Sequence, residues 1–265
     1  MRILGLLVIL LLSFQISAGA ASLQEIQLAA ERGDAKAQVK LGGIYIQGDG
    51  IPKDPEEGYR WYVKAAEQGY APAQASLGAL YEVGEGVPTD LKEAVGWYTK
   101  AAEQGNAHSQ YRLGSIYASG EGITKDPKKS LTWYTKAAEQ GHASAQVNLG
   151  FIYASGEGIT KDLKEAVKWY TKAAEQGDAT AQFNLGVFYS NNQDTGTAIK
   201  WYTKAADQGH SNAQVNLGVM YAKGEGVTMN KIKAFNWLMK AAKQGNVDAQ
   251  KNLDILCKES PWACK

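Results

Sequence analysis

Apolar residues recur along the chain with the spacing of helices rather than of strands. One set, at i, i+4, i+7 and i+8, consists of Ala145, Leu149, Ile152 and Tyr153. The next set, at i, i+3, i+4, i+7 and i+8, consists of Ala166, Trp169, Tyr170, Ala173 and Ala174. Each set lies on one face of an amphipathic helix, where large aromatic side chains alternate with small residues that make room for them. The pattern therefore predicts helix pairs with aromatic residues in their core.

This helix pair is repeated six times. Successive tryptophans are 36 residues apart except for one interval of 32, and they are Trp61, Trp97, Trp133, Trp169, Trp201 and Trp237. The glycines of six Leu-Gly pairs keep the same intervals, at Gly42, Gly78, Gly114, Gly150, Gly186 and Gly218. Because one helix pair cannot bury its own apolar face, neighbouring copies must share a core. We predict an all-α solenoid of αα-hairpin repeats, in which Gly150 of the fourth repeat lets a neighbouring helix approach closely.

The repeats also define the domain organisation. We assign residues 21–33 to an N-terminal capping helix, residues 34–245 to six repeats, and residues 246–265 to an incomplete C-terminal capping repeat. The fifth repeat differs from the others, because the segment NNQDTG at residues 191–196 replaces their Gly-x-Gly turn and makes the repeat four residues shorter. We expect a local change in the stacking or in the exposed turn there.

Polar residues and glycines mark the ends of the predicted helices. Asp90 and Asp162 precede second helices that carry Glu93 and Glu165 three residues later, which predicts capping boxes. A glycine that closes the last turn in the left-handed conformation is expected at the end of each second helix, as at Gly177.

The repeat consensus reads A-x-A-Q-x-x-L-G-x-x-Y-x-x-G-x-G-[VI], followed by a second helix that ends in W-Y-x-K-A-A-x-Q-G. Over residues 34–256 it closely resembles the Sel-1-like repeat, a relative of the tetratricopeptide repeat. The resemblance implies a right-handed superhelix that serves as an adaptor or assembly scaffold for a protein or peptide partner. Exported bacterial members of the family are often linked to envelope assembly or to interaction with host cells.

The first residues predict a secretory signal peptide over residues 1–20. Arg2 precedes an apolar run at residues 3–12, and the small residues Ala18, Gly19 and Ala20 follow. We therefore expect an exported protein, periplasmic or secreted, without an integral membrane segment after cleavage. Without Arg2, 27 basic residues face 27 acidic ones, and this balance argues against nucleic acid as a partner.

Two cysteines lie seven residues apart near the end of the chain, at Cys257 and Cys264, with Pro261 between them. In an oxidising compartment they predict a disulfide that staples the terminal repeat, with redox catalysis and metal binding as weaker alternatives. The spacing also resembles that of the Helicobacter cysteine-rich proteins, exported Sel-1-like proteins described as weak penicillin hydrolases. A β-lactam-binding or weakly β-lactam-hydrolysing protein is therefore the alternative function.

Other side chains do not form a predicted catalytic or metal site. A serine enzyme that hydrolyses β-lactams should carry Ser-x-x-Lys, and no serine in this sequence has lysine at that distance. The histidines, His108, His142 and His210, are interpreted as exposed residues near helix starts. We expect no cofactor and no metal, and we do not expect an enzyme.

Specific binding must depend on positions that differ between repeats. Two residues before each Leu-Gly glycine, the first helices carry Lys40, Ser76, Arg112, Asn148, Asn184 and Asn216. In helix-pair solenoids the first helices line the concave side, so we predict that these residues bind an extended peptide, together with Phe151 and Val187 as apolar contacts. The tetratricopeptide resemblance implies the same use of comparable positions. Two alternatives remain: the asparagines are only a solvated repeat consensus, or the protein is a purely structural envelope component.

Overall fold

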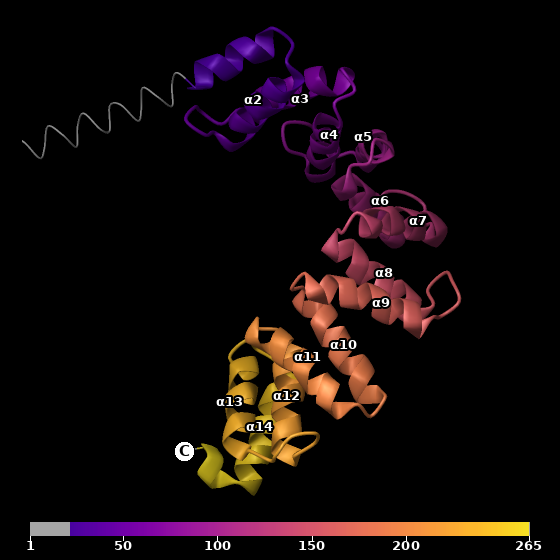
Figure 1. Ribbon diagram of the computed structural model, residues 1–265. Coiled ribbons are helices and arrows are strands. Elements are labelled where there is room, and N and C mark those ends of the chain that lie inside the picture. Colours follow the sequence, from indigo (N-terminus) through magenta and orange to yellow (C-terminus); the bar gives the residue numbers. More distant parts are fainter. Residues whose placement is uncertain (1–21, 265) are drawn as a thin grey trace, which may run out of the picture. The chain divides into compact units, whose positions relative to one another are not determined.

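The computed structural model describes residues 22–264, which form helices joined by short turns (Figure 1). The predicted all-α fold of consecutive helix-pair repeats is confirmed. A helix over residues 22–31 precedes the first repeat. The predicted signal peptide, residues 1–20, lies outside the described residues. Within the described part, no helix combines the length and the apolar character needed to cross a membrane.

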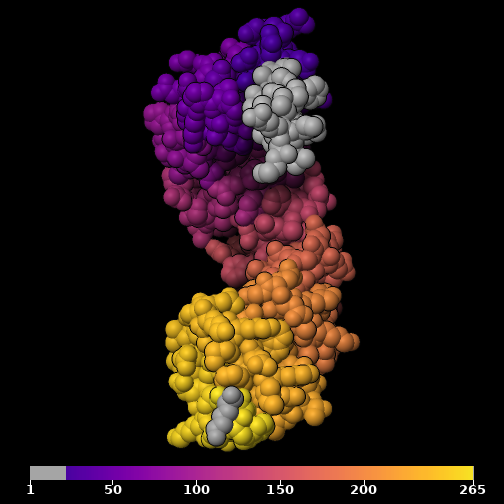
Figure 2. Space-filling view, turned by 90° about the vertical axis from the view of Figure 1, so that its left-hand side faces the viewer, coloured from indigo at the N-terminus to yellow at the C-terminus, as the bar shows by residue number. Residues whose placement is uncertain are grey.

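The chain divides into two compact units, with the boundary after residue 137. In the first unit, the first helices of the repeats are α2 (Ala35–Gln47), α4 (Ala71–Val83) and α6 (Ala107–Ser119). The second helices are α3 (Pro55–Glu67), α5 (Leu91–Glu103) and α7 (Pro127–Glu139), the last of which crosses the boundary. Within each unit, side chains fill the space between successive repeats (Figure 2).

The second unit continues the alternation. Its first helices are α8 (Ala143–Ser155), α10 (Ala179–Asn191) and α12 (Ser211–Lys223). Its second helices are α9 (Leu163–Glu175), α11 (Thr195–Asp207) and α13 (Lys231–Ala242). The chain ends with α14 (Val247–Glu259) and the short 3₁₀ helix η1 (Pro261–Cys264).

A close contact between glycine and an aromatic ring joins the two helices of each hairpin. Gly78 of α4 lies against the ring of Tyr98 of α5, and a Cβ atom added to Gly78 would be 2.6 Å from Tyr98 Cδ1. The same contact joins Gly42 to Tyr62, Gly114 to Tyr134, Gly150 to Tyr170 and Gly186 to Tyr202, whereas Gly218 meets Leu238. The predicted close approach at Gly150 is confirmed, and it recurs at the other glycines, where a side chain would overlap the tyrosine ring or, at Gly218, the side chain of Leu238.

The second helix of a hairpin also carries a tryptophan, which packs against buried residues of the two helices before it. Trp97 of α5 packs against a buried cluster formed by Ala65 and Ala66 of α3 and by Ala73 and Leu77 of α4. The tryptophans of α7, α11 and α13 pack in the same way against the clusters of the preceding helices. One tryptophan per repeat therefore ties three successive helices together.

A lysine three residues after each tryptophan covers the outer face of its ring. The Nζ atom of Lys64 lies 3.6 Å from the centroid of Trp61, and that of Lys240 lies 4.1 Å from Trp237. These lysines are exposed, and their ammonium groups make cation–π contacts with the indole rings. The lysine that recurs in the repeat thus shields a half-buried aromatic residue from water.

Buried glutamines connect each repeat to the previous one. Gln74 Nε2 donates to the Ala66 carbonyl at 3.3 Å, and Gln74 Oε1 accepts from Gln104 Nε2 at 2.7 Å. In the second unit, Gln182 bonds in the same way to Ala174 and Gln208, at 3.1 and 2.8 Å. The Ala66 and Ala174 carbonyls, near the ends of second helices, also accept from the backbone N–H groups of Gly69 and Gly177, at 2.9 and 3.1 Å, so each glutamine amide adds a second hydrogen bond there.

The helix caps differ in one detail from the prediction. Asp90 Oδ1 accepts from the backbone N–H groups of Lys92 and Glu93, as an N-cap should. The backbone N–H of Asp90, however, donates to the Tyr81 carbonyl at 2.9 Å. The same bond joins Asp162 to Tyr153. A capping box would have these aspartate N–H groups donate to the glutamate three residues later, so this part of the prediction was wrong. These N–H groups instead fasten the turns to the preceding first helices.

Two of the histidines cap first helices. His142 Nδ1 accepts from the backbone N–H of Ala145, and His210 Nδ1 accepts from that of Ala213, each at 3.3 Å. The ring of His210 also stacks on Phe183, with centroids 4.6 Å apart. Burial lowers the pKa of His210 below its ordinary value of 6.5. The neutral ring is therefore favoured, and only the neutral ring can accept at Nδ1.

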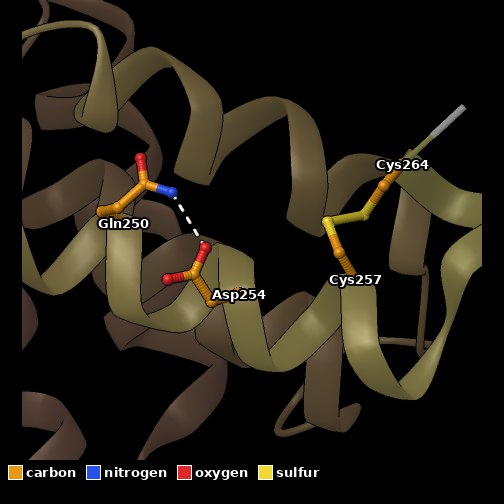
Figure 3. Close-up of a disulfide and its surroundings, with 4 residues drawn as sticks. All are labelled: Gln250, Asp254, Cys257 and Cys264. Atoms are coloured by element: carbon orange, nitrogen blue, oxygen red, sulfur yellow. Dashed lines mark hydrogen bonds between the residues drawn. A yellow bond between two sulfur atoms is a disulfide. The ribbon is translucent and has the colours of Figure 1, made fainter.

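Helix α14 follows the sixth repeat and begins like the first helix of a repeat, but η1 comes after it. Asp254 of α14 stands where the other first helices carry glycine, and it accepts a 2.9 Å hydrogen bond from Gln250 Nε2 (Figure 3). A side chain is tolerated there because α14 is followed by η1 rather than by a second helix. A disulfide joins Cys257 of α14 to Cys264 of η1, with Cα atoms 5.6 Å apart (Figure 3).

Replacement of Gly78 by alanine tests the hairpin contact. We expect Gly78→Ala to lower the free energy of unfolding by about 1–3 kcal/mol, because its methyl group overlaps the Tyr98 ring. The matched control is Gly96→Ala in α5, where an added Cβ meets no atom within 4 Å and should stabilise the helix by up to about 1 kcal/mol. Urea denaturation measures both values, and equal changes in the two variants would refute the role of the contact.

The His210 cap predicts a loss of stability in acid. Because the pKa is lowered in the folded state, the unfolded chain binds more protons, and stability falls as the pH drops below about 6.5. His210→Asn keeps a capping oxygen, as Asn106 and Asn246 do in other repeats, and should remove this part of the pH dependence. Thermal unfolding between pH 5 and 8 is the measurement, with His108→Asn as the control. A pH profile shared by wild type and His210→Asn would contradict the assignment.

Candidate protein-binding surface

The predicted binding residues lie on the first helices and form one group in each unit. We call these groups the first-helix strips: Lys40, Ser76 and Arg112 in the first unit, and Asn148, Asn184 and Asn216 in the second. Successive first helices contact each other within a unit, as α2 does with α4, α4 with α6, and α10 with α12. Lys40, Ser76 and Arg112 therefore lie on helices in contact, as do Asn184 and Asn216 in the second unit.

A tyrosine of the preceding repeat positions several of the strip residues. The ring of Tyr202 packs on Gly186, and its hydroxyl reaches α12, where it forms a hydrogen bond with Asn216. Ser190 of α10 bonds to the same hydroxyl. In the first unit, Tyr62 forms the corresponding hydrogen bond with Ser76 of α4. The tyrosine that holds a hairpin together thus also contacts the strip of the next repeat, 14 residues further along the chain.

Arg112 takes part in a larger polar cluster. Its guanidinium forms an ion pair with Glu82 of α4, including a 3.2 Å bond from Nε to Oε2. The Tyr98 hydroxyl donates to the same Oε2 atom at 2.7 Å. Burial raises the pKa of Tyr98 to about 12, so the hydroxyl keeps its proton and remains a donor. Arg112 was predicted to bind a peptide, but in this structure its guanidinium is already paired with Glu82.

The remaining strip residues have no such partners. Within the described part of the chain, the side chains of Lys40, Asn148 and Asn184 make no hydrogen bond or ion pair. The ring of Phe151, one turn from Asn148 on α8, is 55% exposed. Val187 of α10 is half-buried against the core of α11 and α12. The strip of the second unit therefore offers unused amide groups beside an exposed aromatic ring.

A groove of about 290 Å³ opens beside α10 in the second unit. It includes two of the predicted residues, Asn184 and Val187. It also includes residues that the repeat pattern did not indicate as binding residues. Among them are Lys161, which lies two residues before α9, and Leu163, the first residue of α9. The signal in the sequence was the shortened turn of the fifth repeat, which follows α10 directly.

The comparison with family models finds the Sel1 repeat six times, over residues 35–70, 71–106, 107–142, 143–178, 179–210 and 211–246. Within residues 22–264, no three histidine, cysteine, aspartate or glutamate residues are grouped closely enough to hold a metal ion. No curated protein matches the chain.

Two solved structures are similar to most of the chain. One is a protective antigen present in uropathogenic Escherichia coli strains with an SLR fold, at 36% identity and a TM-score of 0.87; the match covers 94% of this chain and 56% of the antigen. This chain thus spans little more than half the length of that relative. The other is a Sel1 repeat protein from Oxalobacter formigenes, at 33% identity and a TM-score of 0.70, with 84% and 99% covered. On the evidence of the six matched repeats and of the helix pairs that they form, this chain belongs to the Sel1 repeat family.

Proposed function

We propose that this protein is an exported scaffold that binds a segment of a partner protein on its first-helix strips, with binding rather than catalysis as its activity. The proposal rests above all on the second unit, where the Asn184 side chain has no partner among residues 22–264 and Phe151 is 55% exposed. An amide side chain can donate to and accept from a peptide backbone, and an exposed ring supplies apolar area that a partner can cover. Sel1 repeats are protein-interaction modules, which supports the same class of function.

The polar cluster around Arg112 favours the second unit over the first as the main contact. To bind a partner's anion, Arg112 would first have to leave Glu82, and breaking a partly buried ion pair has a cost. Asn148 and Asn184 need no such exchange. We therefore place the contacts that determine affinity on α8 and α10.

No observation favours the β-lactam alternative. That alternative depended on the spacing of Cys257 and Cys264, and both cysteines form the bond that joins α14 to η1. A staple between α14 and η1 accounts for this spacing without a catalytic role.

Two observations support the proposed export. Residues 1–20 have the three-part pattern of a secretory signal, and a disulfide in a small terminal element persists only in an oxidising compartment. The similar Escherichia coli protein is described as a protective antigen, which agrees with a location outside the cytosol.

Mass spectrometry of the protein made in a bacterial host with its full N-terminus tests export. We expect the intact mass of a chain that has lost residues 1–20, and no reaction of Cys257 or Cys264 with an alkylating reagent before reduction. A variant in which the apolar run at residues 3–12 carries two lysines is the control, and its cysteines should react. A chain that keeps residues 1–20 and reactive thiols in both proteins would contradict export.

Photo-crosslinking tests the binding surface. A photoreactive amino acid replaces Phe151 in one protein and Ile232 of α13 in another, since both side chains are 55% exposed in the native chain. We expect a discrete crosslinked protein from position 151 and none from position 232. The partner identified by mass spectrometry should then bind Phe151→Ser at least about tenfold more weakly than Ile232→Ser, as expected for the loss of a large apolar contact. Equal binding by the two variants would reject the strip as the contact surface.

A further inference from the structure

The Gly-x-Gly turn of one repeat covers the start of the second helix in the repeat before it. A Cβ atom added to Gly122, in the turn after α6, would be 2.5 Å from Cδ1 of Leu91, the first residue of α5. One added to Gly226, after α12, would be 2.6 Å from Cβ of Thr195, the first residue of α11. The turn therefore closes the space between a first helix and the preceding second helix.

The fifth repeat lacks this cover. There, α10 ends at Asn191, and three residues lead directly into α11. Leu163, the first residue of α9 and the counterpart of Leu91, is left 45% exposed. The same shortening leaves open the groove beside α10, whose apolar lining includes Leu163, Val167, Val187 and Phe188.

The polar groups along this groove are unused. Within the described residues, the side chains of Lys161, Asn184 and Asn191 make no hydrogen bond or ion pair, although all three residues line the groove. Tyr170 also lines the groove, and among residues 22–264 none forms a hydrogen bond with its hydroxyl, whereas that of Tyr98 donates to Glu82. Burial raises the pKa of Tyr170 to about 12, so its hydroxyl is a neutral donor.

Volume and charge indicate what the groove can hold. Its volume of about 290 Å³ lies at the lower limit of small-molecule pockets, which suits one large side chain of a peptide better than a cofactor. Lys161 is the one charged residue among those that line it, and no carboxylate is present to pair with this cation. An occupant with its own carboxylate would complete that pair.

We propose that the shortened fifth repeat forms a docking groove for an extended segment of a partner protein, in which a bulky apolar side chain stands next to an aspartate or glutamate. The apolar side chain packs between Leu163 and Val187, the carboxylate pairs with Lys161, and Asn184 and Asn191 bond to the peptide backbone. This inference rests on the proposed scaffold function and assigns it a specific site and ligand chemistry.

The first test fills the groove with the protein's own turn. Residues 191–194 are replaced by a copy of residues 223–230, which restores the Gly-x-Gly turn of the sixth repeat in the fifth. Because five other repeats fold with this turn, the filled variant should keep the helical circular dichroism spectrum and the melting temperature of the wild type. A library of octapeptides displayed on phage is selected on the wild type, with prior removal of clones that bind the filled variant.

We expect the selected peptides to contain Leu, Ile, Met or Phe beside Asp or Glu. Fluorescence anisotropy with a synthetic selected peptide should show binding to the filled variant that is at least about tenfold weaker, since the apolar side chain loses its site. Lys161→Glu should weaken binding roughly fivefold and favour a peptide with lysine in place of the acidic residue. Lys125→Glu, at the same position of the third repeat, is the matched control and should bind like the wild type.

The inference would be overturned if the selected peptides lacked the acidic neighbour, or if a selected peptide bound the wild type and the filled variant with equal affinity. It would also be overturned if the wild type formed dimers in sedimentation velocity and the filled variant did not. The last result would make a second copy of the chain the occupant. Failure of the scaffold function is recognised separately. If the protein crosslinked at position 151 binds the filled variant as well as the wild type, the scaffold function stands and the groove does not serve it.

Discussion

The structure depends on the contact between a glycine of the first helix and an aromatic ring of the second helix, which five of the six hairpins make and in which Leu238 takes the place of the ring in the sixth. At Gly150 and Gly186, the ring of the following tyrosine lies where any Cβ atom would stand, so the two helices approach more closely than side chains would allow. The ring can still contact other aromatic side chains, as that of Tyr202 contacts Phe183, and its hydroxyl lies at the far end from the backbone. In Tyr202 it bonds to Asn216 on the predicted binding strip. Core packing and surface chemistry are therefore linked through one residue per repeat.

The remaining contacts extend only to the adjacent repeat, and this explains how the fifth repeat can be shorter than the others. It keeps the packing of Tyr202 on Gly186 and the hydrogen bond from Gln208 to Gln182 at 2.8 Å, which are the contacts that hold helices together. What it loses is a turn that only covers the start of α9. In a protein stabilised by nearest-neighbour contacts, such a deletion alters the surface at one place without disturbing the core. Surface grooves can thus arise at single repeats.

Several expectations from the sequence agree with the structure because they concern contacts that every repeat makes. The period of the tryptophans, the glycines of the Leu-Gly pairs and the helix ends at residues such as Asp90 describe the same hairpin six times, so each copy supports the others. The expectation that was wrong concerned one bond. The N–H of Asp90 donates to Tyr81, in the preceding helix, and the hairpin motif alone gives no indication of where that turn folds back. The peptide-binding role of the strips stays a prediction.

By itself, the sequence determined the helix pairs, their number and the residues of the core, because apolar periodicity and glycine positions act over a few helical turns. Only the tertiary structure decided which polar residues on the first helices are available to a partner. Arg112 and Asn184 occupy the same position in their repeats, yet Arg112 is paired with Glu82, 30 residues earlier, whereas Asn184 has no partner among the described residues. The difference depends on the residues that the preceding repeat brings within hydrogen-bonding distance, and the repeat period does not specify these.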